Sequence, residues 1–143
     1  MATPEGFAEA FIEFINNGAR FEDLQLLLIS KNEGIELQRM MNFSQEEIDM
    51  SLNAELYEKT LKKLEKFWVQ QNFNKRLSLR PYKFQSFSYT KKTDMVLIGF
   101  RINATDKNGL IHTFQLEGIL KIKENWKSIY SDLNDFRDVW LVQ

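Results

Sequence analysis

His112 is the only histidine in the chain, and its position is compatible with two kinds of role. The segment 109–122 reads GLIHTFQLEGILKI, and His112 falls in the apolar phase of its two-residue alternation. In an apolar pocket a neutral imidazole can act as a general base or hydrogen-bond a ligand. The alternative is a half-buried core residue bonded to the backbone or to a tyrosine. We favour the core residue, because a titratable group is only a site candidate until a partner is found.

The other residue types exclude several chemistries. The chain has no cysteine and one histidine, which excludes disulfides and thiol catalysis and leaves too few ligands for a typical zinc site. It contains no glycine-rich phosphate loop, no Gly-x-Ser-x-Gly elbow and no His-Glu-x-x-His helix. Residues 106–109, DKNG, resemble the start of a calcium loop but fit a hairpin turn better. We therefore expect no metal and no cofactor.

The composition is that of one globular domain. The chain has 143 residues with 43% hydrophobic content and twelve phenylalanines, which predicts a single domain over 1–143. No apolar run approaches the length of a membrane span, and acidic residues stand where a secretory signal would be basic. We expect a soluble, cytoplasmic protein that does not bind membranes.

The first half of the sequence predicts helices. Thr3 and Pro4 form a helix start, and apolar residues recur at helical spacing until Asn17-Gly18. Residues 21–31 predict a second helix, which Gly34 breaks, and the segment 34–41 is ambiguous. A capping box at Ser44 begins an amphipathic helix that runs to about residue 71.

The second half predicts an antiparallel hairpin with a defined register. The even-numbered apolar residues of 95–106 and 109–122 share a face only if Asp106 lies opposite Leu110, with a three-residue loop that ends in Gly109. The predicted pairs are Ala104–His112, Ile102–Phe114, Phe100–Leu116, Ile98–Gly118 and Val96–Leu120, all on the core face.

A bulge is predicted in the preceding strand. The aromatic phase changes between Phe84 and Phe87, and one extra residue near Gln85-Ser86 would place all its aromatics on the core face and bend the sheet. The residues expected to face the helices are Tyr82, Phe84, Phe87, Tyr89, Phe100, Phe114 and Trp126. The fold class is therefore α+β, with N-terminal helices packed on a bent antiparallel meander, and VWLVQ at 139–143 is a candidate last strand.

This order of elements, which ends in the hairpin LKIKENWKSIY at 120–130, resembles the nuclear-transport-factor-2-like superfamily of α+β cones. The resemblance implies that the segment 34–41 supplies an early strand and that a cone encloses a site. Catalytic members of the superfamily typically use an inward Asp-His or Asp-Tyr pair. Here Asp94 lies at a turn and no carboxylate shares the inward phase of the central strands, so we assign no catalytic residue.

Four polar-tipped residues are placed to line a hollow cone. They are His112, Tyr89, Trp126 and Tyr130. Such a pocket would suit a small hydrophobic or aromatic ligand. If the cone is filled, Trp68 and phenylalanines of the first helix occupy this volume and His112 belongs to the core.

We predict a noncatalytic binding or protein-interaction domain that forms a homodimer through an apolar strip on the outer sheet face. The strip consists of Met95, Leu97, Ile111 and Ile119. A different protein partner is an alternative, and so is a ligand-binding domain or a cyclase-like or isomerase-like enzyme around His112.

Charge segregation gives a third functional class. Residues 1–58 carry twelve acids and three bases, whereas residues 59–92 carry one acid and ten bases. The basic stretch interleaves aromatics with cations, as in proteins that bind single-stranded nucleic acid through a segment such as 73–92. We favour the alternative in which these cations form the outer face of a strand. The acidic and basic segments would then attract each other within a monomer or across a dimer, and nucleic acid is not the expected partner.

Overall fold

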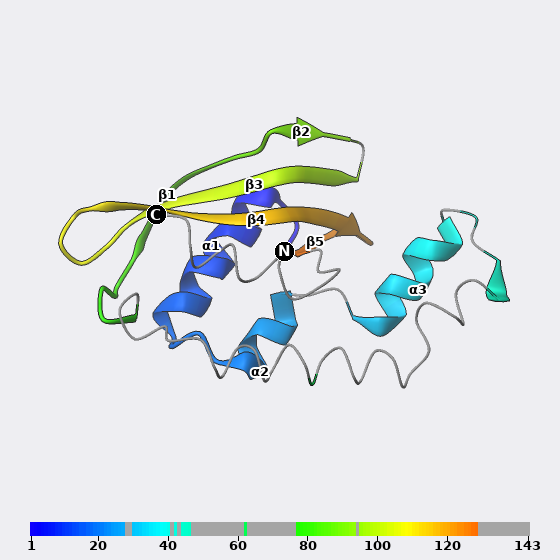
Figure 1. Cartoon of the computed structure of the whole chain (residues 1–143), viewed down its shortest axis with the longest axis horizontal. Helices are drawn as coiled ribbons and strands as arrows, with labels where there is room; N and C mark the ends of the chain where they lie inside the picture. The colour runs from blue at the N-terminus through cyan, green and yellow to red at the C-terminus, as the bar shows by residue number, and fades with distance from the viewer. Residues whose placement is uncertain are drawn as a thin grey trace.

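The computed structural model describes a helix-and-sheet fold over most of the chain, namely residues 1–27, 30–40, 42, 44–46, 62, 77–93 and 95–128. Its elements are, in order, α1 (Pro4–Asn16), α2 (Phe21–Leu24), the 3₁₀ turn η1 (Gln25–Leu27), α3 (Lys31–Met40), β1 (Lys83–Ser88), β2 (Lys91–Lys92), β3 (Val96–Thr105), β4 (Ile111–Ile122) and β5 (Asn125–Ser128) (Figure 1). The α+β class is confirmed. The predicted helix over 44–71 lies almost entirely outside the described residues. Trp68 and the predicted strand 139–143 lie outside them completely.

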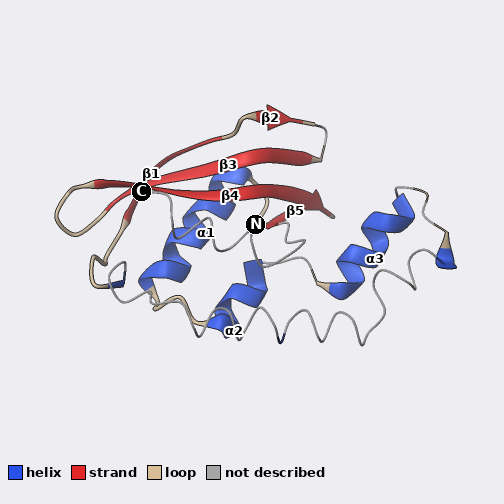
Figure 2. Cartoon of the chain, in the orientation of Figure 1, coloured by secondary structure: helices blue, strands red, loops and turns tan. Residues whose placement is uncertain are grey.

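Helix α1 begins where the sequence predicts. The side chain of Thr3 accepts a hydrogen bond from the N–H of Gly6 at 2.9 Å, and Pro4 occupies the first turn. The apolar face of α1 is buried, with residues Phe7, Ala8, Phe11, Ile12, Phe14 and Ile15. These residues pack in one core with residues of the sheet, and α1 lies alongside β3 and β4 (Figure 2).

The segment after α1 departs from prediction in two places. The predicted helix over 21–31 is a single turn, α2, followed by η1. Gly34 does not break a helix, because it lies inside α3. The segment 34–41 is therefore helical over 34–40, and the early strand that the superfamily resemblance implies is absent there. None of the described helices is long and apolar enough to cross a membrane.

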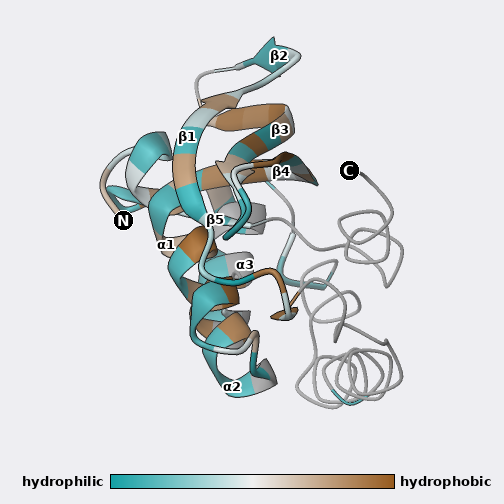
Figure 3. Cartoon of the chain, turned by 90° about the vertical axis from the view of Figure 1, so that its left-hand side faces the viewer, coloured by the Kyte–Doolittle hydropathy of each residue, from teal (hydrophilic) through white to brown (hydrophobic). Residues whose placement is uncertain are grey.

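The sheet is antiparallel and has the order β1-β3-β4-β5, with β2 pairing β3. Every predicted pair of the central hairpin is confirmed, from Ala104 with His112 to Val96 with Leu120. Gly109 has a φ of 83°, the left-handed conformation that the three-residue loop requires. The short edge strand β2 consists of two exposed lysines and is hydrophilic (Figure 3).

The predicted bulge in β1 is confirmed. Phe84 pairs with Ala104 and Ser86 pairs with Asn103, so Gln85 is the extra residue. Phe84 and Phe87 consequently pack on the same core, and Phe87 stacks on Phe100 with ring centroids 5.5 Å apart. Tyr82 is buried, but Tyr89 is 43% exposed, so the prediction that Tyr89 faces the helices is wrong.

A second bend, which the sequence analysis missed, lies at Gly99. Its φ is +65°, and the buried positions of β3 change there from odd-numbered, at Leu97, to even-numbered, from Phe100 onward. Ile98 is therefore 41% exposed and does not join the core face, contrary to prediction. Leu97 and Ile119 turn into the core, with exposures of 2% and 0%.

The predicted apolar strip on the outer sheet face does not form. Leu97 and Ile119 are core residues, Met95 is half-buried, and only Ile111 is largely exposed, at 70%. The outer face near the hairpin loop is instead polar. There Thr113 donates a hydrogen bond to Asn103, which donates to Ser86, at 2.7 and 3.1 Å. The strip therefore no longer supports the predicted dimer.

Candidate functional site

Asp106 organises the end of the β3–β4 hairpin. Its side chain is fully buried, and its Oδ1 accepts hydrogen bonds from the backbone N–H groups of Asn108 and Leu110 at 2.8 and 3.1 Å. Its own backbone N–H donates to the Leu110 carbonyl at 2.8 Å. Aspartate is favoured in such turns because its short side chain can replace missing backbone partners. Asp106 thus closes the loop that Gly109 permits.

The second oxygen of Asp106 binds His112. The distance between His112 Nε2 and Asp106 Oδ2 is 2.7 Å, and the two side chains are 15% and 0% exposed. Burial raises the pKa of the Asp106 carboxyl, but the hydrogen bonds from His112 and from the N–H groups of Leu110 and Asn108 outweigh it and hold this pKa below its ordinary value. A carboxylate can only accept hydrogen bonds, so Nε2 carries the proton.

The prediction that no carboxylate shares the inward phase of the central strands is wrong, because Asp106 is buried beside His112. Asp106 follows Ala104 by two residues and therefore continues the even-numbered core phase of β3. The signal was available in the predicted register, which already placed Asp106 opposite Leu110, next to His112. It was missed because a hairpin aspartate was interpreted only as a turn residue.

Tyr82 completes the cluster around His112. Its ring meets the imidazole edge-to-face with centroids 5.5 Å apart, and it meets Phe114 in the same way at 5.4 Å. The backbone of Tyr82 is held by Asn16 at the end of α1. Tyr82 N–H donates to Asn16 Oδ1 at 2.7 Å, and Asn16 Nδ2 donates to the Tyr82 carbonyl at 2.9 Å. The cluster therefore joins α1 to the sheet.

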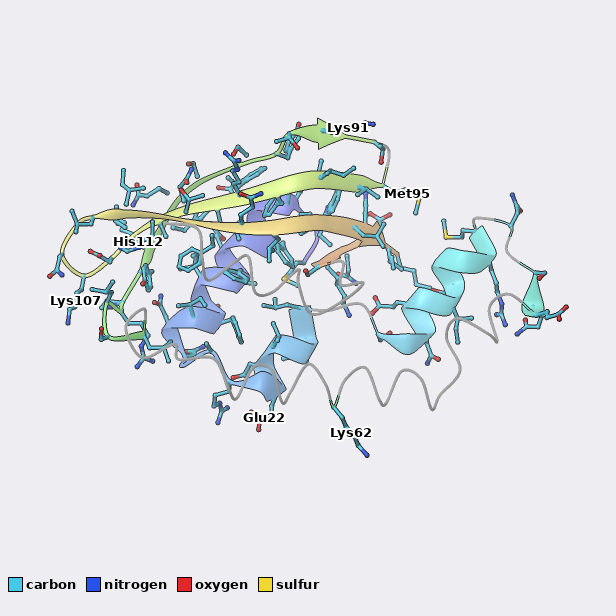
Figure 4. The ribbon with its side chains drawn as sticks, viewed as in Figure 1. Glu22, Lys62, Lys91, Met95, Lys107 and His112 are labelled. Atoms are coloured by element: carbon cyan, nitrogen blue, oxygen red, sulfur yellow. The ribbon has the colours of Figure 1, made fainter. Side chains whose placement is uncertain are left out.

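The hairpin loop is also fixed to the turn at 77–80. Lys107 N–H donates to the Leu79 carbonyl at 2.9 Å. Arg80 donates to the carbonyls of Leu77 and Asn16 at 2.7 and 3.2 Å. His112 and Lys107 lie together at this end of the sheet, and Met95 lies at the other (Figure 4). The contacts make the hairpin end a rigid structure.

The described residues among those predicted to line a ligand pocket do not come together. Trp126 pairs with Lys121, nine residues along β4 from His112, which is about 30 Å at the rise of a strand. Trp126 is 8% exposed in the core, and Tyr89 is exposed beyond the end of β1. Tyr130 lies outside the described residues. Of the three that the structure describes, only His112 belongs to the cluster with Asp106 and Tyr82.

The chemical capacity of this cluster is limited. A carboxylate that orients an imidazole can support a general base at the other ring nitrogen. Among the described residues Nδ1 has no hydrogen-bond partner, so it is the atom that would act. Within the same part of the chain no group of three or more histidine, cysteine or acidic residues could hold a metal ion.

The basic stretch keeps its aromatics inside. Phe84 and Phe87 pack on the core, whereas Lys83, Lys91 and Lys92 are exposed. Base stacking requires exposed rings. In the described part of this stretch only Tyr89 offers an exposed ring, which favours a solvated cationic face over a nucleic-acid site.

Comparisons of this chain with protein-family models, with curated proteins and with solved structures give no match.

Proposed function

We propose that this domain is a noncatalytic protein-binding module that forms a homodimer through the end of the β3–β4 hairpin. The observation that carries the proposal is the Asp106–His112 pair. Both carboxylate oxygens are used inside the hairpin, at 2.7 to 3.1 Å. A group whose hydrogen bonds all hold the fold is a structural element, and here it makes the hairpin end rigid.

The rigid end presents two large apolar side chains to solvent. Leu110 is 64% exposed and Ile111 is 70% exposed. A stable dimer buries about 800 Å² on each partner, so these two residues would be the central anchors of a larger contact. The polar outer face that includes Asn103 and Thr113 adjoins Ile111 and would form the rim, and a two-fold axis would bring the same surface together from both copies.

Sedimentation equilibrium of two matched variants tests this proposal. The double variant Leu110→Ser, Ile111→Ser should weaken self-association by at least about tenfold, because anchor residues commonly contribute over 1 kcal/mol each. Leu26→Ser is the control, since Leu26 is also 70% exposed but lies in η1. A strictly monomeric wild-type protein, or equal dimer affinities for the two variants, would contradict the proposal.

Membership of the nuclear-transport-factor-2-like superfamily is a separate proposal. It is supported by N-terminal helices packed on a bent antiparallel sheet and by the hairpin in which β4 and β5 are joined through Lys123-Glu124. Helix α3, in the place of the early strand, is a departure from that pattern. A crystal structure in which the predicted helix over 44–71 does not pack on the sheet would contradict this membership.

A catalytic role is the second candidate, because the structure shows an acid within hydrogen-bond reach of His112. Reaction with diethyl pyrocarbonate distinguishes the two roles, and the single histidine makes the readout unambiguous. For a structural pair we expect His112 to react at least about tenfold more slowly in the folded protein than in urea, since its side chain is only 15% exposed and local unfolding must first expose the imidazole. A folded protein that reacts as fast as the unfolded chain would favour an accessible catalytic base.

A further inference from the structure

A cleft lies at the other end of the sheet, between α3 and the end of β4. Its volume is about 320 Å³, near the lower limit for ligand sites. With about 30 Å³ for each water-sized group, it would hold on the order of ten non-hydrogen atoms. The cleft is lined by one wall from each element, namely Glu36, Arg39 and Met40 of α3 and Lys121, Ile122 and Lys123 at the end of β4.

The lining has an excess of positive charge. Of the six described lining residues, three are cations and one is an anion. Lys123 Nζ binds Glu36 Oε1 at 2.9 Å, which uses the one carboxylate among the described lining residues. Lys121 Nζ lies 3.7 Å from Glu124 Oε2, a distant partner that is 88% exposed, and such a pair contributes little. The described contact of Arg39 is with the neutral amide of Gln45, at 3.4 Å.

The lining also has an apolar part. Ile122 is buried, with 4% of its surface exposed, and Met40 is 62% exposed. An exposed methionine beside a cavity suits a flexible apolar ligand, because its unbranched thioether side chain adapts to different shapes. Cations and apolar side chains thus share one small cavity.

Two ion pairs fix the α3 wall against the sheet. Lys127 Nζ of β5 binds Glu33 Oε1 at 2.8 Å, and both side chains are largely buried, at 23% and 18% exposed. Glu33 also accepts a hydrogen bond from Ser30 N–H and donates its own N–H to Ser30 Oγ, which forms a capping box at the start of α3. The Lys123–Glu36 pair, whose side chains are 71% and 39% exposed, adds a weaker link three residues further along α3. The cleft is therefore a preformed feature of the fold.

We propose that this cleft binds a small amphiphilic anion, an acid headgroup on a short apolar chain. The headgroup would lie between Arg39 and Lys121, and the chain would lie against Ile122 and Met40. The site is independent of the proposed dimer contact, because it uses none of the residues at the hairpin end. A neutral amphiphile would lack the charge-assisted hydrogen bonds, and a cationic one would be repelled.

Titration of the ¹⁵N-labelled protein with octanoate, followed by NMR, tests the proposal. We expect saturable shifts at the amides of residues 36–40 and 121–123. Octyl phosphate should shift the same amides, and the tighter of the two ligands identifies the headgroup as carboxylate or phosphate. Octylammonium should leave them unmoved. Absence of shifts with millimolar octanoate, or equal binding of octylammonium, would overturn the proposal.

Variants distinguish the cleft from general anion binding. Arg39→Gln and Lys121→Gln should each weaken octanoate binding by about fivefold, which is about 1 kcal/mol at 25 °C. Met40→Ser should weaken it through the apolar chain. Lys107→Gln is the control, because Lys107 is an exposed cation at the opposite end of the sheet. Equal weakening by Lys107→Gln would overturn the assignment to this cleft.

Discussion

Gly99→Ala is expected to destabilise the domain by about 2–3 kcal/mol, through two separable effects. The first is conformational, because Gly99 has a φ of +65°, where a Cβ costs about 1–2 kcal/mol. The second is steric. A Cβ at Gly99 would overlap Thr90 Oγ1 and would lie 3.1 and 3.2 Å from Thr90 Cγ2 and Cβ. Overpacking of this kind costs about 1–3 kcal/mol, and the reduced entropy of the unfolded chain offsets about 0.5–1 kcal/mol of the total.

Two further variants separate these effects. Gly109→Ala carries the conformational cost alone, since Gly109 has a φ of +83° and an added Cβ would meet nothing within 4 Å. Thr90→Ala removes the overlapping atoms and loses the hydrogen bond from Thr90 Oγ1 to the Ile98 carbonyl, which is 3.0 Å long and exposed. In the Thr90→Ala background the cost of Gly99→Ala should fall by about 1 kcal/mol, a coupling typical of residues in contact.

Urea unfolding of the wild type and the four variants, which include the Thr90→Ala, Gly99→Ala double variant, gives the midpoint as the readout and an unchanged slope as the check on two-state behaviour. The expected order of stability loss places Gly99→Ala above Gly109→Ala. If the two glycine variants lose equal stability and Thr90→Ala gives no relief, the steric part of the reasoning is wrong. If Gly99→Ala costs nothing, the bend at Gly99 is not required by the fold.

The remaining predictions concern the cluster around His112. Asn16→Ala should lower the free energy of unfolding by about 2 kcal/mol, because two backbone groups of buried Tyr82 lose their Asn16 partner. Asn17→Ala, at the exposed neighbouring position, should lower it by less than about 0.5 kcal/mol, and equal unfolding midpoints for the two variants would contradict this prediction. The lowered pKa of Asp106 means that this group stabilises the fold above about pH 4 and that the contribution is lost as pH falls through the folded-state pKa. Asp106→Asn should therefore flatten the acid limb of a plot of unfolding midpoint against pH, and parallel wild-type and variant limbs would refute the role of the carboxylate.

The sequence predicted the hairpin and the bulge because both depend on counting along short segments. Loop length, the phase of apolar residues and Gly109 together allow one register, and that register is observed. The aromatic phase change between Phe84 and Phe87 likewise requires one extra residue, which is Gln85. The same counting failed at Gly99, because it assumed that alternation continues through a glycine with a left-handed conformation. The predicted apolar strip on the outer sheet face failed for the same reason, because Leu97 and Ile119 were counted on the wrong face.

Helix α3 shows a different limit. Gly34 costs about 1 kcal/mol within a helix, and this local penalty predicted a break. The helix continues because Glu33 and Glu36 bind Lys127 and Lys123, residues that only the folded sheet brings into reach. Periodicity in 34–41 carries no information about those partners. The predicted break at Gly34 failed because tertiary contacts outweigh the low helix propensity of glycine.

Sequence separation explains why one end of the sheet could be inferred and the other could not. His112 and Asp106 are six residues apart, so the hairpin register alone brings them side by side. Glu33 and Lys127 are 94 residues apart, and no alternation of apolar residues links them. The hairpin end is therefore a consequence of local pairing, whereas the cleft depends on α3 docking. A variant that weakens that docking, such as Glu33→Gln, should change the NMR shifts of the amides that line the cleft and leave those of the hairpin register unchanged.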